Sequence, residues 1–340
     1  MQIKFLRTFF TVTFSVAVAF TALLAVSLIG LPIAGAAEPV PSAKPRIDAT
    51  LTSRETAAAV EAPKATPAPA MAKHFLWEVK SPSTTAYLFG TIHVGKAAFY
   101  PLPAAIEAAA DTAAKLVVEA DITRTDELEG VPAMIGYTPP DNLAQHIPKS
   151  LVERLKRQLA RFKVPEAAAL SMKPFVVGGL LAISEFSRLG YDMAYGVDSY
   201  LIGKAKEDGK QILELESQRA QLALMAQMPP ELQEAFLDNA VAGLEAGSTA
   251  EQVTGMVNAW QTGDTALMEE VAMAVNKNMR QTAKLDEVLL YGRHPGMLAK
   301  IEGYLATREL HFIAVGSLHL VGPRGLLAGL KSKGFVVIQK

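Results

Sequence analysis

Four short apolar segments in this chain each lead into a histidine or acidic residues, and other stretches, several of them long and helical in pattern, separate them. The segments are AYLFGTIH, KLVVEAD, QILELE and FIAVGSLH, and they carry His93, Glu119, Glu216 and His319. Short apolar runs bounded by turn residues are typical of buried strands, and strands that alternate with helices indicate an α/β domain. The pattern predicts an α/β fold whose central mixed sheet has flanking helices and large helical insertions.

The remaining elements follow from the same patterns. Aromatic and β-branched residues on both sides of a Ser-Pro-Ser turn predict a hairpin over residues 75–79 and 85–92. Further strands are expected at 115–120, 211–216, 311–315 and 335–339, and helices at 103–114, 196–207 and 322–333. Between 217 and 305 the chain is helical in pieces, with breaks at Pro229-Pro230, Gly247 and Gly263.

The first seventy residues divide into two parts. Residues 1–37 have a positive start, a long apolar run and small residues at their end, which is the layout of a secretory signal peptide. The apolar run is also long enough for an uncleaved membrane anchor, and that alternative stays open. Residues 38–73 are rich in Ala and Pro and are expected to form a disordered tether. We therefore expect residues 74–340 to form the folded domain, exported to the periplasm or surface of a bacterium.

Composition narrows the chemistry. The net charge is −1 and the basic residues are scattered, so we expect no nucleic-acid partner. Any contact with a membrane would run only through the N-terminal segment. There is no cysteine, which excludes thiolate nucleophiles and cysteine-ligated metals. Any metal site has to be built from His, Asp, Glu and water.

Two Gly-x-x-His motifs, Gly90 to His93 and Gly316 to His319, stand at strand ends near the two ends of the domain. A glycine after an apolar run allows a sharp turn or a close backbone approach, which would direct each histidine towards the strand-end cleft. Ligands of open α/β sheets bind at the carboxyl ends of the strands. If the four strands are parallel neighbours, the histidines and glutamates meet at one edge. The alternative is that each histidine only caps a strand end.

Three further residues are candidates for this edge. Glu119 directly follows Leu-Val-Val, where a carboxylate is costly to bury unless it is paired or ligating. Glu216 is preferred over Glu214 as the second carboxylate. Arg293 would hold the carboxylates ionised or bind an anionic intermediate, unless it is an exposed residue at a helix end. Asp198 is expected to be a helix N-cap rather than a ligand.

These motifs resemble the TraB/PrgY/GumN family, to which the Tiki metalloproteases also belong. The resemblance rests on FLWEV…AYLFGTIHVG, VVEAD, GVDSYL…QILELES, Gly292-Arg293 and FIAVGSLHLVG, in that order from about Phe75 to Val337. It implies a divergent α/β fold related to the erythromycin-esterase and ChaN-like groups. It also implies that the family's paired histidines correspond to His93 and His319. In the family Asn often follows the arginine, whereas this chain has His294 there.

The expected activity is metal-dependent hydrolysis of peptides or proteins. His93, His319 and Glu119 would bind a divalent transition metal, with Mn, Co and Zn all admissible, and an open position would hold water. Glu119 or Glu216 would act as general base and Arg293 would stabilise the oxyanion. A metal-free variant uses the same residues as acid and base. The alternative class is a non-enzymatic protein that binds or sequesters a peptide or a haem-like ligand.

Overall fold

A six-stranded sheet lies at the centre of the computed structural model, which describes residues 73–124, 126, 129–276 and 280–340. The strand order is β4-β3-β5-β2-β1-β6. The strands are β1 (Leu76–Lys80), β2 (Thr85–Thr91), β3 (Lys115–Val118), β4 (Gln211–Glu214), β5 (His311–Gly316) and β6 (Val336–Gln339). The hairpin β1–β2 and the antiparallel pairing of β1 with β6 make the sheet mixed, so the predicted fold class is confirmed.

The four strands that precede the candidate residues are parallel neighbours. Strand β3 pairs in parallel with both β4 and β5, and β5 pairs in parallel with β2. The register sets Thr91 opposite Gly316, and Val118 opposite Ala314 on one side and Glu214 on the other. All four carboxyl ends therefore lie at one edge of the sheet, which is the condition that a shared site requires.

Strands β3 and β4 each end two residues before the predicted position. Backbone pairing nevertheless continues beyond them, because Leu215 N–H donates to the Val118 carbonyl at 2.9 Å and Glu216 N–H to the Glu119 carbonyl at 2.8 Å. Glu119 and Glu216 thus stand side by side just past the ends of their strands.

Helices fill the intervals between the strands. They are α2 (Ala104–Thr112), α3 (Val131–Ile135), α4 (Lys149–Arg161), α5 (Glu166–Leu170), α6 (Pro174–Arg188), α7 (Val197–Glu207), α8 (Gln218–Ala226), α9 (Pro230–Ala246), α10 (Ser248–Thr262), α11 (Thr265–Asn276), α12 (Thr282–Leu289), α13 (His294–Leu305) and α14 (Leu326–Ser332). Short 3₁₀ turns are η1 (Ala97–Phe99), η3 (Leu143–Gln145), η4 (Met193–Tyr195), η5 (Tyr291–Arg293) and η6 (Ser317–His319). The two large helical insertions lie between β3 and β4 and between β4 and β5.

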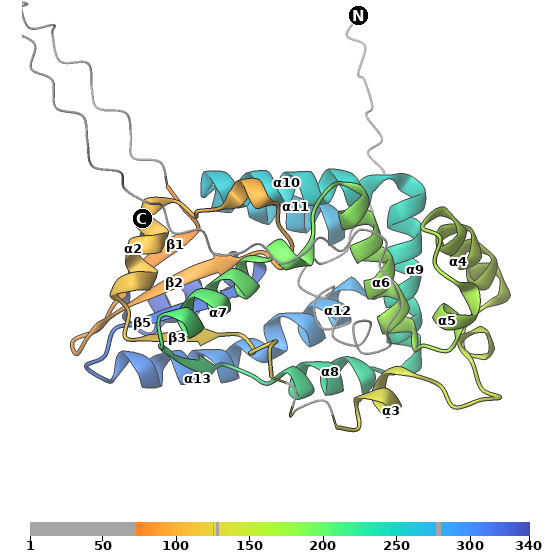
Figure 1. The fold of residues 1–340 in the computed structure, drawn as a ribbon, viewed down its shortest axis with the longest axis horizontal. Coiled ribbons are helices and arrows are strands. Elements are labelled where there is room, and N and C mark those ends of the chain that lie inside the picture. Colours follow the sequence, from red (N-terminus) through yellow and green to blue (C-terminus); the bar gives the residue numbers. More distant parts are fainter. Residues whose placement is uncertain (1–72, 125, 127–128, 277–279) are drawn as a thin grey trace, which may run out of the picture.

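The sheet lies at one end of the molecule with α7 and α13 along it, and the inserted helices α4, α5, α6 and α9 lie at the other end (Figure 1). Helices α6 and α9 pack against each other in the helical half, with α4 and α5 beyond them, and α7 packs on β3 and β4. The buried apolar side chains form one continuous core, and every residue of β5 is buried. A strand covered on both faces explains why β5 is a continuous apolar run.

The predicted signal segment and almost all of the predicted tether lie outside the described residues. Within the part of the chain that the structure describes, no helix has both the length and the apolar character needed to cross a bilayer.

Candidate active site

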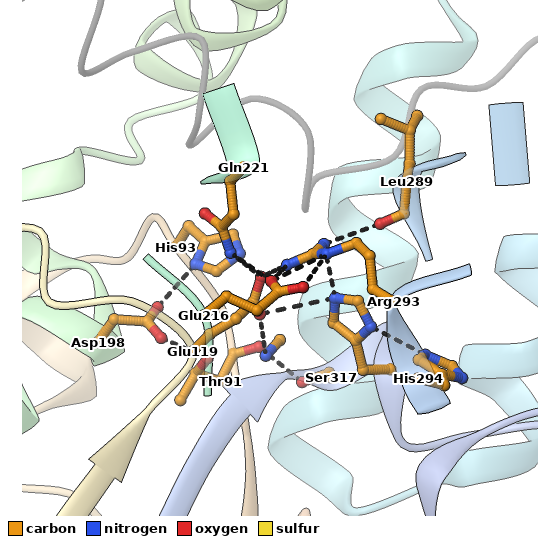
Figure 2. Close-up of polar contacts among 12 residues, drawn as sticks. Thr91, His93, Glu119, Asp198, Glu216, Gln221, Leu289, Arg293, His294 and Ser317 are labelled. Carbon is orange, nitrogen blue, oxygen red and sulfur yellow. Dashed lines mark hydrogen bonds and ion pairs between the residues drawn. The ribbon is translucent and has the colours of Figure 1, made fainter. Parts of the chain in front are cut away.

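The carboxyl ends of β2, β3, β4 and β5 bring the predicted residues together, and we call this place the strand-end site (Figure 2). His93 Nε2, Glu119 Oε2 and His319 Cδ2 each lie 3.5 Å from the position that a Cβ atom on Gly316 would take. At most twice that distance, 7.0 Å, therefore separates the two histidine rings. Gly316 leaves this small space open for the three groups to face one another.

The two Gly-x-x-His motifs pack directly against each other. A Cβ atom on Gly90 would lie 2.7 Å from a Phe75 ring carbon and 2.9 Å from Ser317 Oγ, so only glycine fits there. Ser317 Oγ donates to the Thr91 carbonyl at 2.8 Å, and the Trp260 indole N–H donates to the Gly90 carbonyl at 2.7 Å. The predicted close approach at the first glycine is thus a contact with the second motif itself.

His93 is held by a buried aspartate at the start of α7. A Cβ atom on Gly196 would lie 2.5 Å from the His93 carbonyl oxygen, so this glycine allows α7 to begin against the first motif. Asp198 Oδ2 then accepts from His93 Nδ1 at 2.8 Å, while Asp198 Oδ1 accepts from Thr91 Oγ1 at 2.7 Å. The prediction that Asp198 is the N-cap is wrong: Gly196 occupies that position and the carboxylate points into the site.

The charge of Asp198 decides the proton affinity of His93. His93 and Asp198 are only 6% and 5% exposed. Burial by itself lowers the pKa of His93, but the adjacent Asp198 carboxylate and its hydrogen bond outweigh burial and raise the pKa above the ordinary value. Nδ1 of His93 is bonded to Asp198, and the other nitrogen, Nε2, lies 3.5 Å from the position of a Cβ atom on Gly316. This is the arrangement of an oriented general base.

His319 has a different kind of partner. It is fully buried, and its Nδ1 lies 2.9 Å from Nε2 of His294. Its Nε2 lies 3.1 Å from Nη1 of Arg293. The two motifs are alike in sequence, yet one histidine contacts a carboxylate and the other contacts a second histidine and a guanidinium.

Arg293 lies between the carboxylates of Glu119 and Glu216. Its Nη2 donates to both, and its Nε donates to Glu216 at 3.0 Å. Nη1 donates to the Leu289 carbonyl at 2.8 Å and faces His319 Nε2. A guanidinium has five N–H donors, so every donor of Arg293 is directed at an acceptor within the protein.

Gln221, from α8, closes the network on the far side of the glutamates. Its amide nitrogen donates to Glu119 Oε1 at 2.7 Å and to Glu216 Oε2 at 3.1 Å. The backbone N–H of Gly316 lies 3.2 Å from the other Glu119 oxygen. Burial opposes ionisation of Glu119, but the guanidinium of Arg293 holds the pKa of this carboxyl well below its ordinary value. Glu119 is therefore ionised at neutral pH although it is buried.

The same geometry tests whether these residues fit a metal ion. An ion needs at least three lone pairs directed at one point, and within the described residues no group of three or more His, Asp or Glu has that spacing. The guanidinium of Arg293 takes the place between Glu119, Glu216 and His319 Nε2. The expected ligands His93, His319 and Glu119 do come together, but Glu119 and His319 are bonded to Arg293 and His93 to Asp198, so the three do not fit a metal ion.

Four residues of the strand-end site were missed or undervalued in the sequence. Thr91 gave no signal of its own, Gln221 follows the QILELES segment but was given no role, and Asp198 was assigned to a helix cap. His294, which stands where the family often has Asn, contacts His319 directly. Glu214, the carboxylate that was not preferred, lies away from the network and pairs with Arg124 at 2.8 Å.

Comparisons with known proteins assign the chain to a family. The model of the TraB/PrgY/gumN family matches residues 75–339. Two curated relatives, both named "Uncharacterized protein YbaP", come from Shigella flexneri and from Escherichia coli (strain K12). Each is 24% identical over 263 residues, which cover 74% of this chain and 92% of the relative. No solved structure matches. The family match covers every strand and every residue of the strand-end site, and the chain belongs to the TraB/PrgY/gumN family.

Proposed function

We propose that this protein is a hydrolase of amide or ester bonds in which His93 is the general base. The observation that carries the proposal is the buried bond from His93 Nδ1 to Asp198, with His93 Nε2 on the side of the ring towards Gly316 and Glu119. A carboxylate behind an imidazole fixes its tautomer and stabilises the imidazolium that forms during proton transfer. The expected metal-dependent mechanism is replaced by a metal-free one, because Arg293 takes the place of the ion.

The reaction begins when His93 Nε2 removes a proton from a water molecule. The water oxygen forms a bond to the substrate carbonyl carbon, and the carbonyl electron pair moves to oxygen. Collapse of this tetrahedral intermediate breaks the bond to the leaving group, which takes the proton from the His93 imidazolium. Proton transfer of this kind contributes roughly 10²–10⁴-fold to rates.

Arg293 supplies the positive charge next to the reacting carbonyl. Among its acceptors, Glu119 and Glu216 are anions, whereas His319 Nε2 is a neutral nitrogen at 3.1 Å. The developing oxyanion would take this N–H at a smaller electrostatic cost than either carboxylate bond. A charged donor fixed in a buried site stabilises an oxyanion effectively.

Peptides are the first substrates to test, and the export expected from residues 1–37 places them outside the cytoplasm. Purified full-length protein would be incubated with a diverse peptide library and with chromogenic esters, with and without a chelator. We expect hydrolysis that resists chelation and that falls at least 100-fold in His93→Gln. Fractionation of cells that express the full chain tests export separately.

The chain offers a matched control. His146 and Asp141 form a second His–Asp pair, also at 2.8 Å, but both side chains are exposed and lie outside the strand-end site. His146→Gln should leave hydrolysis unchanged. Full activity in His93→Gln, or loss of activity on chelation that added metal restores, would refute the proposal. Saturable peptide or haem binding without turnover would favour the binding alternative.

A further inference from the structure

The hydrogen bonds of His294 define where its proton is. His294 is 4% exposed, and its Nδ1 lies 2.8 Å from the backbone carbonyl oxygen of Arg324. A carbonyl oxygen only accepts, so Nδ1 carries a proton and donates it. Its second nitrogen, Nε2, faces His319 Nδ1 at 2.9 Å, so one of these two nitrogens donates the proton of the bond between them.

The partners of the His319 ring determine which of its nitrogens carries the proton. At one end of the ring, Nε2 faces Nη1 of Arg293 at 3.1 Å, and because a guanidinium only donates, Nε2 accepts. At the other end, Nδ1 is 2.9 Å from His294 Nε2. An imidazole ring keeps a proton on at least one nitrogen, so His319 carries its proton on Nδ1 and donates it to His294.

One acceptor near His319 would favour a proton on Nε2 instead. This acceptor is Glu119 Oε2, and at 3.6 Å it lies farther from His319 Nε2 than Nη1 of Arg293 does, at 3.1 Å. The three N–H donors form one directed chain, from Arg293 to His319, from His319 to His294, and from His294 to the Arg324 carbonyl.

We propose that His294 is a positioning residue that fixes His319 with its proton on Nδ1, so that His319 Nε2 holds the Arg293 guanidinium between the two glutamates. The proposal rests on the proposed function for its catalytic meaning, because Arg293 is the charge placed beside the reacting carbonyl. Transfer of the His319 proton from Nδ1 to Nε2 would direct an N–H group at an N–H group of Arg293 and displace the guanidinium. In this proposal the histidine of the second motif positions Arg293, and the histidine of the first motif transfers the proton.

Nitrogen-detected NMR tests this assignment without any substrate. The full-length protein would be labelled with ¹⁵N-histidine, and long-range ¹H–¹⁵N spectra recorded at pH 7 would show which ring nitrogen of each of the six histidines carries a proton. Resonances are assigned by substituting one histidine at a time. For His319 we expect a bound proton on Nδ1 and none on Nε2. A proton on Nε2, or protons on both nitrogens, would overturn the proposal.

A variant separates positioning from general support of the fold. His294→Phe keeps a ring of similar size but removes the acceptor, and it should abolish the single-tautomer spectrum of His319. His311→Phe is the control, because His311 is also buried and has its Nδ1 3.1 Å from a backbone carbonyl, but it contacts no residue of the strand-end site. An unchanged His319 spectrum in folded His294→Phe protein would also overturn the proposal.

Failure of this proposal is distinct from failure of the proposed function. If the wild-type spectrum shows the expected His319 tautomer while no substrate is hydrolysed, the positioning role stands and the hydrolase falls. If hydrolysis depends on His93 but His319 carries its proton on Nε2, the base stands and the positioning role falls.

Discussion

Replacement of Arg293 by methionine should destabilise the protein strongly at neutral pH. Arg293 and Glu119 have side chains only 10% and 11% exposed, and the guanidinium serves Glu119 and Glu216 together. Its removal leaves Glu119 with the Gln221 amide, the Gly316 N–H and the nearby His319 ring, and leaves Glu216 with the Gln221 amide. Breaking a buried ion pair from one side costs about 3–5 kcal/mol, and that range is the expected loss in the free energy of unfolding.

The loss in the free energy of unfolding in Arg293→Met should depend on pH with a definite sign. In the wild type Arg293 holds the pKa of Glu119 below its value in the unfolded chain. Its ionisation therefore stabilises the fold above the unfolded pKa, and this contribution disappears as the pH falls through the folded pKa. In Arg293→Met burial dominates and raises the folded pKa above the unfolded one. The loss in the free energy of unfolding is then largest at high pH and becomes smaller as the pH falls through the raised pKa of Glu119.

Urea unfolding of the full-length protein at pH 8, 7, 6 and 5 measures this difference. Arg161→Met is the matched control, because Arg161 also binds a buried carboxylate, Glu185, at 3.2 Å. Glu185 keeps a second, two-pronged partner in Arg188, with both bonds at 2.7 Å. We expect Arg161→Met to cost only about 0–1 kcal/mol, as for an exposed ion pair. Equal losses in the two variants, or a loss in Arg293→Met that does not shrink towards pH 5, would refute the reasoning.

Three further substitutions test how the site is positioned. Gly196→Ala should abolish hydrolysis and lower the free energy of unfolding by about 1–3 kcal/mol, because its Cβ atom clashes with the His93 carbonyl. Gly203→Ala is the control in α7, where a Cβ atom meets nothing within 4 Å, and it should raise the free energy of unfolding by roughly 0.5–1 kcal/mol. Asp198→Asn should lower the pKa of His93 in an NMR titration. The wild type should therefore gain stability relative to the variant as the pH falls from 8 to 5. An unchanged pKa of His93 would remove the pair of His93 and Asp198 from the mechanism. Trp260→Phe should lose about 1 kcal/mol of unfolding free energy with its one buried hydrogen bond, and no loss in urea unfolding would show that bond to be immaterial.

The fold could be predicted from the sequence because the patterns that determine its strands and turns are local. Apolar runs identified every strand of the sheet, and the turn residues identified the hairpin that makes the sheet mixed. The breaks expected at Gly247 and Gly263 coincide with left-handed glycines at the ends of α9 and α10, with φ of 73° and 66°. Strands β3 and β4 were predicted to be two residues too long, because the residues after 118 and 214 keep backbone pairing without continuing the strand.

Only part of the strand-end site could be predicted from the sequence, for a physical reason. His93, Glu119, Glu216 and His319 follow apolar strands, so the parallel sheet alone brings them together. Their partners belong to other elements: Asp198 lies 105 positions from His93 and Gln221 lies 102 positions from Glu119. Only tertiary packing selects these pairs. One local signal was available for Asp198, since a glycine two residues before it allows the close approach of α7.

These partners explain how two similar motifs differ in chemistry. Gly-x-x-His sets where a ring stands, but the group bonded to Nδ1 sets what the ring does. A carboxylate on Nδ1 of His93 favours the charged ring, so this histidine is suited to take up and release a proton. A neutral imidazole on Nδ1 of His319 gives no such support, so His319 serves better as a fixed acceptor for the arginine. Exchanging the roles would require exchanging Asp198 and His294, which lie on helices inserted between the strands, and therefore the insertions and not the motifs determine the division of work.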